Sequence, residues 1–228
     1  EVVGIARVTK IKSSLFTWIS KRPYIILPGE WIRMLWRNIG CFLQNVLPFF
    51  PNKRFFVKTV LKNFNQQFID VEYSINKPKY LDWIRKKNPD LIICFSFLYF
   101  GEEILKIPPL GCINRHSSLL PNYAGVFPMF NAVRFRETHT GTTMHYMTKE
   151  IDDGSIITQI KYPFDNTQSV DKLYIENFKY GLTAALEAVE KIRCGDTAPI
   201  INDYPKAYFT FPKEKEIKSF RQANGRFI

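Results

Sequence analysis

Residues 111–125 read GCINRHSSLLPNYAG, and residues 141–154 read GTTMHYMTKEIDDG. In the first segment a short apolar run leads directly to Asn114 and His116, so we expect both side chains at the end of a strand. In the second segment an apolar run ends in two aspartates before a glycine. An amide, an imidazole and a carboxylate are the groups that acyl transfer to an amine requires: an oxyanion donor, a proton carrier and an orienting anion.

Apolar runs alternate with segments of helical spacing along the rest of the chain. Residues 91–97 (LIICFSF) form a continuous apolar run, typical of a strand buried on both faces, and we expect Phe95 in the core. Ser169 can cap a long helix that ends near residue 192, with an apolar stripe of Leu173, Phe178, Leu182, Leu186 and Val189. We predict further strands at residues 1–9, 68–71, 112–114, 142–147 and 156–160, further helices at 77–87, 102–107 and 128–136, and short helices between 10 and 62.

This alternation predicts an α/β fold with a mainly parallel sheet flanked by helices. In such sheets ligands bind beyond the carboxyl ends of the strands. Asn114 and His116 follow one apolar run, and Leu98 and Tyr99 follow another. We therefore expect these residues to share one crevice.

Composition sets further bounds. With 228 residues the chain can bury the core of one substantial domain. The formal net charge of +11 indicates an anionic partner, such as nucleic acid, a membrane surface or a phosphorylated small molecule, or else only serves solubility. There is no signal peptide and no uninterrupted apolar span of membrane length, so we do not expect a membrane protein.

The cysteines and histidines point away from disulfides and metals. Cys41, Cys94, Cys112 and Cys194 show no CxxC spacing, which is typical of buried thiols in a reducing cytoplasm. The chain has three histidines, too few to favour a histidine-based metal site. We therefore expect a cytoplasmic protein that needs no metal.

Taken singly, the polar residues of these segments are weak signals, because a histidine after a strand is usually structural and Asp-Asp-Gly is usually a turn. Taken in order, they form one pattern: N-x-H-x-S-L-L-P from Asn114 to Pro121, Tyr123, Gly125, G-x-T-x-H from Gly141 to His145, and D-x-G from Asp152 to Gly154. This pattern resembles that of the folate-dependent formyltransferases, and the resemblance extends from Pro89 to the end of the long helix.

The resemblance implies a Rossmann-like formyltransferase fold and a donor, 10-formyltetrahydrofolate, whose formyl group passes to a primary amine. The first βα unit of that fold is expected to be missing here, where a loop holds the acceptor's phosphate in some members. We therefore expect an N-terminally incomplete catalytic domain at residues 1–192 and a short C-terminal extension at residues 193–228.

The catalytic residues follow from the same pattern. Asn114 is expected to donate a hydrogen bond to the formyl oxygen, and His116 to donate as well and to carry protons between the amine and the folate nitrogen. The D-x-G spacing selects Asp152 as the carboxylate that orients His116. Asp153 is expected to lie in a turn facing solvent.

The folate pocket of the family is built largely from main-chain groups, so side-chain identity is a poor guide. The resemblance places it at Leu98, Tyr99 and Phe100, facing a loop formed by Thr148, Lys149, Glu150 and Ile151.

The acceptor is expected to be a small phosphorylated amine, and a nucleotide-linked amino sugar ranks first. Methionyl-tRNA, glycinamide ribonucleotide, and a hydrolase that releases formate from the same cofactor are the alternatives. Nucleic acid ranks below a small molecule as a partner, and a homodimer is left open.

Overall fold

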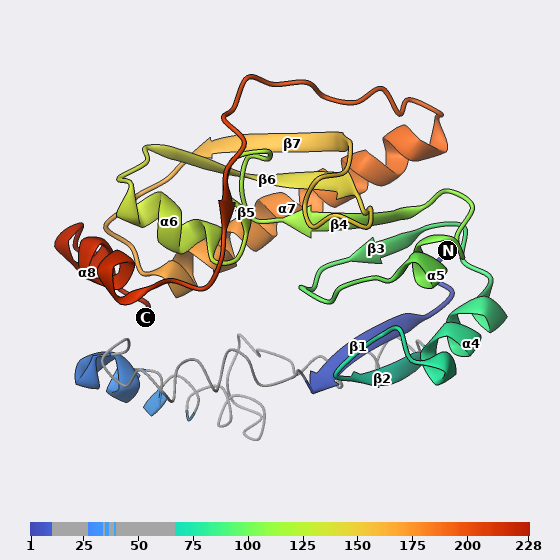
Figure 1. The fold of residues 1–228 in the computed structure, drawn as a ribbon, viewed down its shortest axis with the longest axis horizontal. Helices are drawn as coiled ribbons and strands as arrows, with labels where there is room; N and C mark the ends of the chain where they lie inside the picture. The colour runs from blue at the N-terminus through green and yellow to red at the C-terminus, as the bar shows by residue number, and fades with distance from the viewer. Residues whose placement is uncertain (11–26, 34, 37–38, 40–66) are drawn as a thin grey trace, which may run out of the picture. The chain divides into compact units, whose positions relative to one another are not determined.

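A computed structural model gives the architecture of the chain (Figure 1) and describes residues 1–10, 27–33, 35, 36, 39 and 67–228. The short helices predicted between residues 10 and 62 lie mostly outside these residues. The chain divides into two compact units, Glu1–Lys87 with Ile228, and Asn88–Phe227. The domain boundary predicted at residue 192 falls inside the second unit and stays a prediction.

The first unit contains a two-stranded parallel sheet and a helix. Strand β1 (Ile5–Lys10) pairs with β2 (Phe68–Glu72), and an ion pair of 2.6 Å joins Arg7 to Asp70 across the two strands. Helix α4 (Pro78–Lys87) follows and buries one face, formed by Tyr80, Leu81 and Ile84. The predictions for these elements are confirmed to within a few residues.

The second unit is built on a four-stranded sheet in the order β3-β4-β6-β7. Strand β3 (Ile92–Cys94) is parallel to β4 (Cys112–His116). Strands β6 (His139–Tyr146) and β7 (Ile156–Pro163) are each antiparallel to the strand before them in the sheet. The predicted α/β class is confirmed, although this sheet is mixed: β3 and β4 are parallel, whereas β6 is antiparallel to both β4 and β7.

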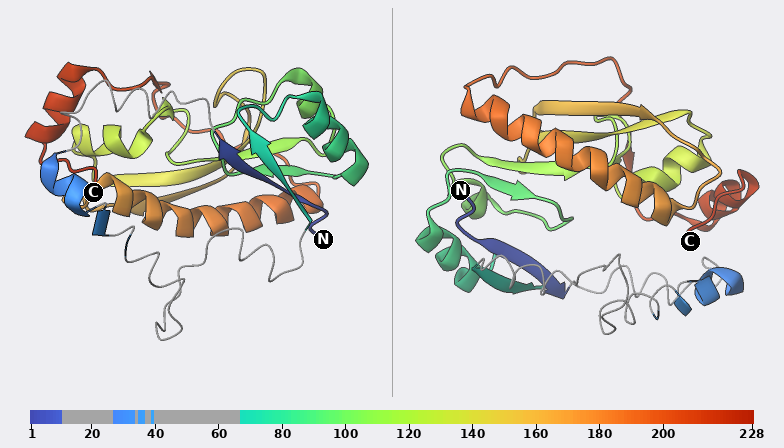
Figure 2. Two further views of the ribbon diagram at one scale, coloured as in Figure 1. Left: turned by 90° about the horizontal axis from the view of Figure 1, so that it is seen from below. Right: turned by 180° about the vertical axis from the view of Figure 1, so that it is seen from behind.

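Helices and short strands surround this sheet. Helix α7 (Val170–Arg193) runs along one face of the sheet and packs on β6 and β7 (Figure 2). Helix α6 (Pro128–Arg134) packs against α8 (Glu214–Gln222). The remaining elements are α5 (Glu102–Leu105), β5 (Ala124–Gly125) and β8 (Tyr208–Phe209), and β5 pairs in parallel with β8.

Helix α7 begins as predicted, because the Ser169 side chain accepts a hydrogen bond from the backbone N–H of Lys172. The predicted apolar stripe is confirmed at Leu173, which is buried, but is wrong at Phe178, Leu182 and Leu186, which are 43%, 59% and 74% exposed. The buried face instead consists of Val170, Leu173, Asn177, Gly181, Ala184, Ala185, Ala188 and Ile192. In the middle of this face, from Gly181 to Ala188, the buried residues are small, and a Cβ added at Gly181 would lie 2.4 Å from Cδ of Arg115.

Strand β3 is shorter and more exposed than predicted. It ends at Cys94, and the side chains of Ile93 and Phe95 are 41% and 38% exposed, so Phe95 is not a core residue. Phe97 is 72% exposed. Because β3 is an edge strand of the four-stranded sheet, its apolar run is not covered on both faces by the elements of this unit.

Candidate active site

Strand β4 sends alternate side chains to the two faces of the sheet, and this separates the polar residues. Ile113 packs in the core beneath α7, whereas Asn114 and His116 point to the opposite face. Both residues lie on the strand: His116 is its last residue, at the strand end as predicted, and Asn114 lies two residues earlier. Asn114 is opposite His145 across β6, and His116 is opposite Thr143.

Arg115 anchors β4 to the helix behind it. Its Nη1 donates to Oδ1 of Asn177 at 2.5 Å, and its guanidinium lies 4.0 Å from the centre of the Phe178 ring. A Cβ added at Gly181 would lie 2.4 Å from Cδ of Arg115, which explains the glycine in mid-helix. Burial lowers the pKa of Arg115. Asn177 also donates to the Gly141 carbonyl at 2.7 Å, so one buried amide joins β4, β6 and α7.

The loop after β4 holds the His116 ring. Tyr123 adopts a left-handed conformation with φ of 56°, and its carbonyl oxygen lies 2.8 Å from His116 Nε2, which must donate. The Tyr123 ring stacks on Phe209 at 5.5 Å, and its hydroxyl donates to Glu137 at 2.5 Å. Burial, and then Glu137, raise the pKa of Tyr123. The loop is thus fixed on both sides of the carbonyl that receives His116.

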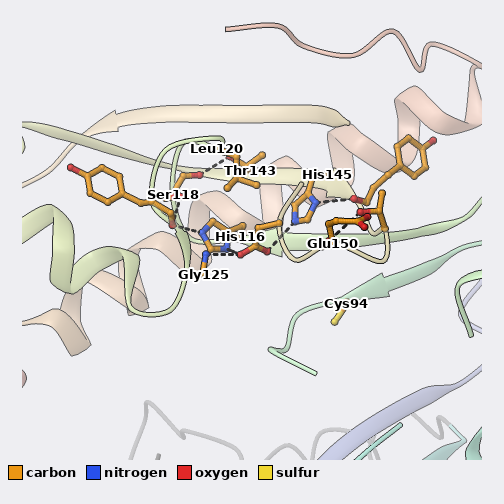
Figure 3. Close-up of polar contacts among 12 residues, drawn as sticks. Cys94, His116, Ser118, Leu120, Gly125, Thr143, His145 and Glu150 are labelled. Carbon is orange, nitrogen blue, oxygen red and sulfur yellow. Dashed lines mark hydrogen bonds and ion pairs between the residues drawn. The ribbon is translucent and has the colours of Figure 1, made fainter. Parts of the chain in front are cut away.

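Asp152 supplies the carboxylate beside His116 (Figure 3). Its Oδ2 lies 3.4 Å from His116 Nδ1 and accepts a hydrogen bond from the Gly125 N–H at 2.8 Å. Its φ is 54°, in the left-handed region that aspartate tolerates better than most residues. At Gly154 an added Cβ would lie 1.8 Å from the Tyr146 carbonyl oxygen, so the last position of D-x-G has room for glycine alone.

Asp153 is exposed to solvent as predicted, and it also forms an ion pair. Its side chain is 44% exposed, and Oδ1 lies 2.5 Å from Lys206 Nζ. The side chain of Asp152 is 9% exposed. The two neighbouring aspartates are therefore clearly separated by environment, and Asp152 is the one that faces the histidines.

The C-terminal segment from Asn202 to Phe209, called the clamp segment below, was not predicted to touch the site. Ala207 donates to the Pro121 carbonyl at 3.2 Å and accepts from the Ala124 N–H at 2.9 Å. The side chain of Asn202 donates to the Leu120 carbonyl at 2.9 Å. The clamp segment therefore fixes the same loop that holds His116. Its sequence signal was only the alternation of aromatic and polar residues around Tyr208.

A second histidine, His145, also reaches Asp152. Its Nε2 lies 3.6 Å from Asp152 Oδ1, on the side away from His116 (Figure 3). The pattern G-x-T-x-H contained this residue, but gave it no role. Its signal was the period of two along β6, which places Thr143 and His145 on one face.

The segments predicted to form the folate pocket approach the same region. Cys94, the last residue of β3, pairs with Asn114 on β4. The segment that runs from Cys94 to Leu98, Tyr99 and Phe100 therefore begins next to Asn114. Lys149 Nζ lies 3.4 Å from Glu102, which joins the loop of residues 148–151 to the start of α5. The side chain of Phe100 is buried, whereas those of Tyr99 and Ile151 are more than half exposed.

The histidine, cysteine and acidic side chains of the described residues bear on metal and thiol chemistry. No group of three or more histidine, cysteine, aspartate or glutamate side chains is placed there to hold a metal ion. Cys94 and Cys112 are buried as predicted, and burial raises the pKa of Cys112 to about 12. Cys194 is exposed, contrary to the prediction, and Cys41 lies outside the described residues. No helix in the described ranges is long and apolar enough to cross a membrane.

Comparison with known proteins identifies the family. The formyl transferase family profile matches residues 56–188, more than half of the chain, and the chain belongs to this family. It is 34% identical over 161 residues to the methionyl-tRNA formyltransferase of Thermotoga sp. (strain RQ2), covering 70% of this chain and 51% of that protein. The chain thus spans about half the length of the curated relatives it matches.

Two solved structures share the fold. A sugar N-formyltransferase from Shewanella sp FDAARGOS_354 superimposes with a TM-score of 0.57 at 16% identity, covering 98% of this chain and 88% of that one. The formyltransferase PseJ from Anoxybacillus kamchatkensis, in complex with UDP-4,6-dideoxy-4-formamido-L-AltNAc and tetrahydrofolate, has a TM-score of 0.54 at 22% identity, covering 70% and 82%. The predicted formyltransferase fold is confirmed.

Proposed function

We propose that the chain carries the catalytic domain of an N-formyltransferase that moves a formyl group from 10-formyltetrahydrofolate to a primary amine. The observation that carries this proposal is the meeting of His116 and Asp152, 3.4 Å apart, on the sheet face that also bears Asn114. Membership of the formyl transferase family supports it. We keep residues 1–192 as the proposed catalytic domain and residues 193–228 as its extension.

The chemistry needs an oxyanion donor, and Asn114 is the proposed one. The amine nitrogen forms a bond to the formyl carbon, and negative charge develops on the formyl oxygen. The amide N–H of Asn114 can donate to that oxygen, and such a donor is worth about two to three orders of magnitude in turnover. The carbon–nitrogen bond to the folate then breaks as the carbonyl re-forms.

Protons must also move, and His116 is the proposed carrier. The attacking nitrogen loses a proton and the folate nitrogen gains one, so the reaction as a whole needs no external acid or base. His116 donates from Nε2 to the Tyr123 carbonyl and faces Asp152 with Nδ1. We propose that the substrate replaces the Tyr123 carbonyl at Nε2, while Asp152 and Gly125 keep the ring and the carboxylate in place.

The donor is proposed to bind along the two segments that flank Asn114. Leu98, Tyr99 and Phe100 supply main-chain groups on one side, and Thr148, Lys149, Glu150 and Ile151 on the other. The ion pair between Lys149 and Glu102 supports this arrangement, because it joins the loop of residues 148–151 to the start of α5, just after Phe100. The PseJ structure contains tetrahydrofolate, which agrees with a folate donor here.

For the acceptor we propose a nucleotide-linked amino sugar. The Shewanella sugar N-formyltransferase matches almost the whole chain, including the clamp segment. Methionyl-tRNA is the second candidate, and the 34% identity to the Thermotoga enzyme favours it. A net charge of +11 suits a pyrophosphate as well as a tRNA.

The test is an assay of tetrahydrofolate formation from 10-formyltetrahydrofolate with separate acceptors. We expect activity with a dTDP- or UDP-linked amino sugar and no formate release in the absence of an amine. Activity confined to methionyl-tRNA would replace the sugar with tRNA as the acceptor. Formate release without any amine would contradict transfer and identify a hydrolase.

A further inference from the structure

Asp152 lies between two buried histidines, and the catalytic proposal uses one of them. Oδ2 faces His116 and Oδ1 faces His145, at 3.4 and 3.6 Å. The side chains of His116 and His145 are 8% and 3% exposed. One carboxylate, with one negative charge, thus faces two imidazoles that are both shielded from water (Figure 3).

The contacts of His145 fix which of its nitrogens carries hydrogen. Nδ1 lies 2.9 Å from the carbonyl oxygen of Tyr146, and a carbonyl can only accept, so Nδ1 donates. In the neutral ring Nε2 is then an acceptor. It is buried and has no hydrogen-bond partner among the described residues. His145 therefore turns a lone pair, not an N–H, toward Asp152.

The neutral form of His145 is favoured by its surroundings. Burial, and then repulsion from His116, lower the pKa of His145 to about 4, although Asp152 acts in the opposite direction. The titratable groups that face it are His116 on β4 and Asp152 in the loop before β7; its neighbours across the two strands are Asn114 and Ile156. Burial and the repulsion from His116 therefore both favour the neutral form of His145.

The residue opposite His145 adds no donor that the structure records. Oδ1 of Asn114 is also buried and lacks a hydrogen-bond partner among the described residues. Among the described residues, none is recorded to donate a hydrogen bond to Oδ1 of Asp152. An N–H donor here would hold Oδ1 and draw the negative charge away from His116.

We propose that His145 is a positioning residue of the active site: held by the Tyr146 carbonyl, its ring closes off Oδ1 of Asp152 without donating to it, so that the carboxylate can accept from Nδ1–H of His116 when that ring carries both protons. The inference rests on the proposed function for its kinetic consequence only. Its structural content is the Nδ1–H tautomer of His145 and the undivided pairing of Asp152 with His116.

The first test measures the ring nitrogens of the wild-type protein by ¹⁵N nuclear magnetic resonance, and needs no substrate. We expect His145 as the neutral Nδ1–H tautomer from pH 6 to pH 8. An Nε2–H tautomer, or a charged His145 ring at pH 7, would overturn the proposal whether or not the protein transfers formyl groups.

The second test replaces His145 with glutamine, whose amide N–H can reach Asp152. Since this donor competes with His116, we expect kcat to fall about tenfold to a hundredfold, less than the loss of an acid–base group, with KM for the folate nearly unchanged. The His116 ring signals should also shift. His139→Gln is the matched control, because His139 is an exposed histidine on the same strand.

A merely structural role would lower the melting temperature and leave the His116 signals and the kcat of the folded fraction unchanged. A folded His145→Gln protein with wild-type kcat and wild-type His116 signals would refute the proposal. If the wild-type protein shows no formyl transfer, the proposed function fails, and the His116 signals of the variant still decide the role of His145.

Discussion

Asn114 and His116 occupy alternate positions of a strand whose other face is locked to α7 by Arg115. Their positions are thus set by the fold, and each can be replaced without moving the strand. We expect Asn114→Ala and His116→Ala to lower kcat by about two to four orders of magnitude, with little change in folate affinity. Steady-state kinetics and calorimetry with a folate analogue would check this, and a loss confined to folate binding would assign these residues to the cofactor.

Asp152 and Asp153 offer a comparison between adjacent residues. Asp152→Asn removes the buried charge that faces His116 and should cost about as much activity as His116→Ala. Asp153→Asn removes only an exposed ion pair to Lys206, which is worth at most about 1 kcal/mol. It should therefore be nearly silent in kcat. An inactive Asp153→Asn enzyme beside an active Asp152→Asn enzyme would show that the wrong aspartate has been selected.

His145 also makes stability depend on pH. Its pKa is about 4 in the folded protein, below the ordinary value of 6.5, so the unfolded chain binds the proton more tightly. Its contribution to stability is therefore complete above about pH 6.5 and is lost as the pH falls toward 4, by up to about 3 kcal/mol. Urea unfolding of the wild type and His145→Gln across this range measures it. A stability difference that does not change with pH would contradict the assigned charge state.

At the scale of elements, the clamp segment and the loop it holds form one unit with the catalytic residues. Gly125 has φ of 90°, and an added Cβ would lie 2.2 Å from the Phe209 carbonyl oxygen. Gly195 also has a positive φ, of 73°, but nothing lies within 4 Å of its added Cβ. Both glycines adopt a backbone conformation that would be strained for alanine, but an added Cβ would meet another atom at Gly125 alone of the two.

This difference defines a matched pair of variants. Gly195→Ala should cost about 1 to 2 kcal/mol of stability from the left-handed backbone alone and leave kcat unchanged. Gly125→Ala carries the same strain, separates β5 from β8, and displaces the N–H that Asp152 accepts from. We expect it to lower both the melting temperature and kcat. Equal effects of the two substitutions on kcat would show that the clamp segment does not act on the site.

At the scale of the whole molecule, the surplus of positive charge distinguishes the two acceptor candidates. A nucleotide-linked sugar presents a pyrophosphate, and its affinity should change only modestly with salt, because exposed charges are screened within roughly 8 Å at physiological ionic strength. A tRNA meeting about six or more basic groups would lose roughly a thousandfold in affinity between about 50 and 200 mM salt. Apparent acceptor affinity measured across this range decides between them. A steep fall of affinity with salt would indicate that the positive charges reflected in the net charge of +11 bind nucleic acid.

The sequence alone determined the α/β class and most elements, because these depend on local periodicity. Helix α4 begins within one residue of its predicted start and ends where predicted, and Ser169 caps α7 as expected. The ordered pattern from Asn114 to Gly154 was enough to indicate the family. The roles of Asn114, His116 and Asp152 stay predictions, although the structure places His116 beside Asp152.

Tertiary structure decided what depends on neighbours distant in sequence. The buried face of α7 is lined with small residues because Arg115 and the sheet approach it closely, which apolar periodicity cannot reveal. The clamp segment contacts the loop through main-chain groups, which leave no trace in side-chain identity. The turn at Asp152 places its carboxylate between the side chains of His116 on β4 and His145 on β6, and this arrangement makes His145 part of the site. Burial and proximity, and not residue type, set the charge of an imidazole.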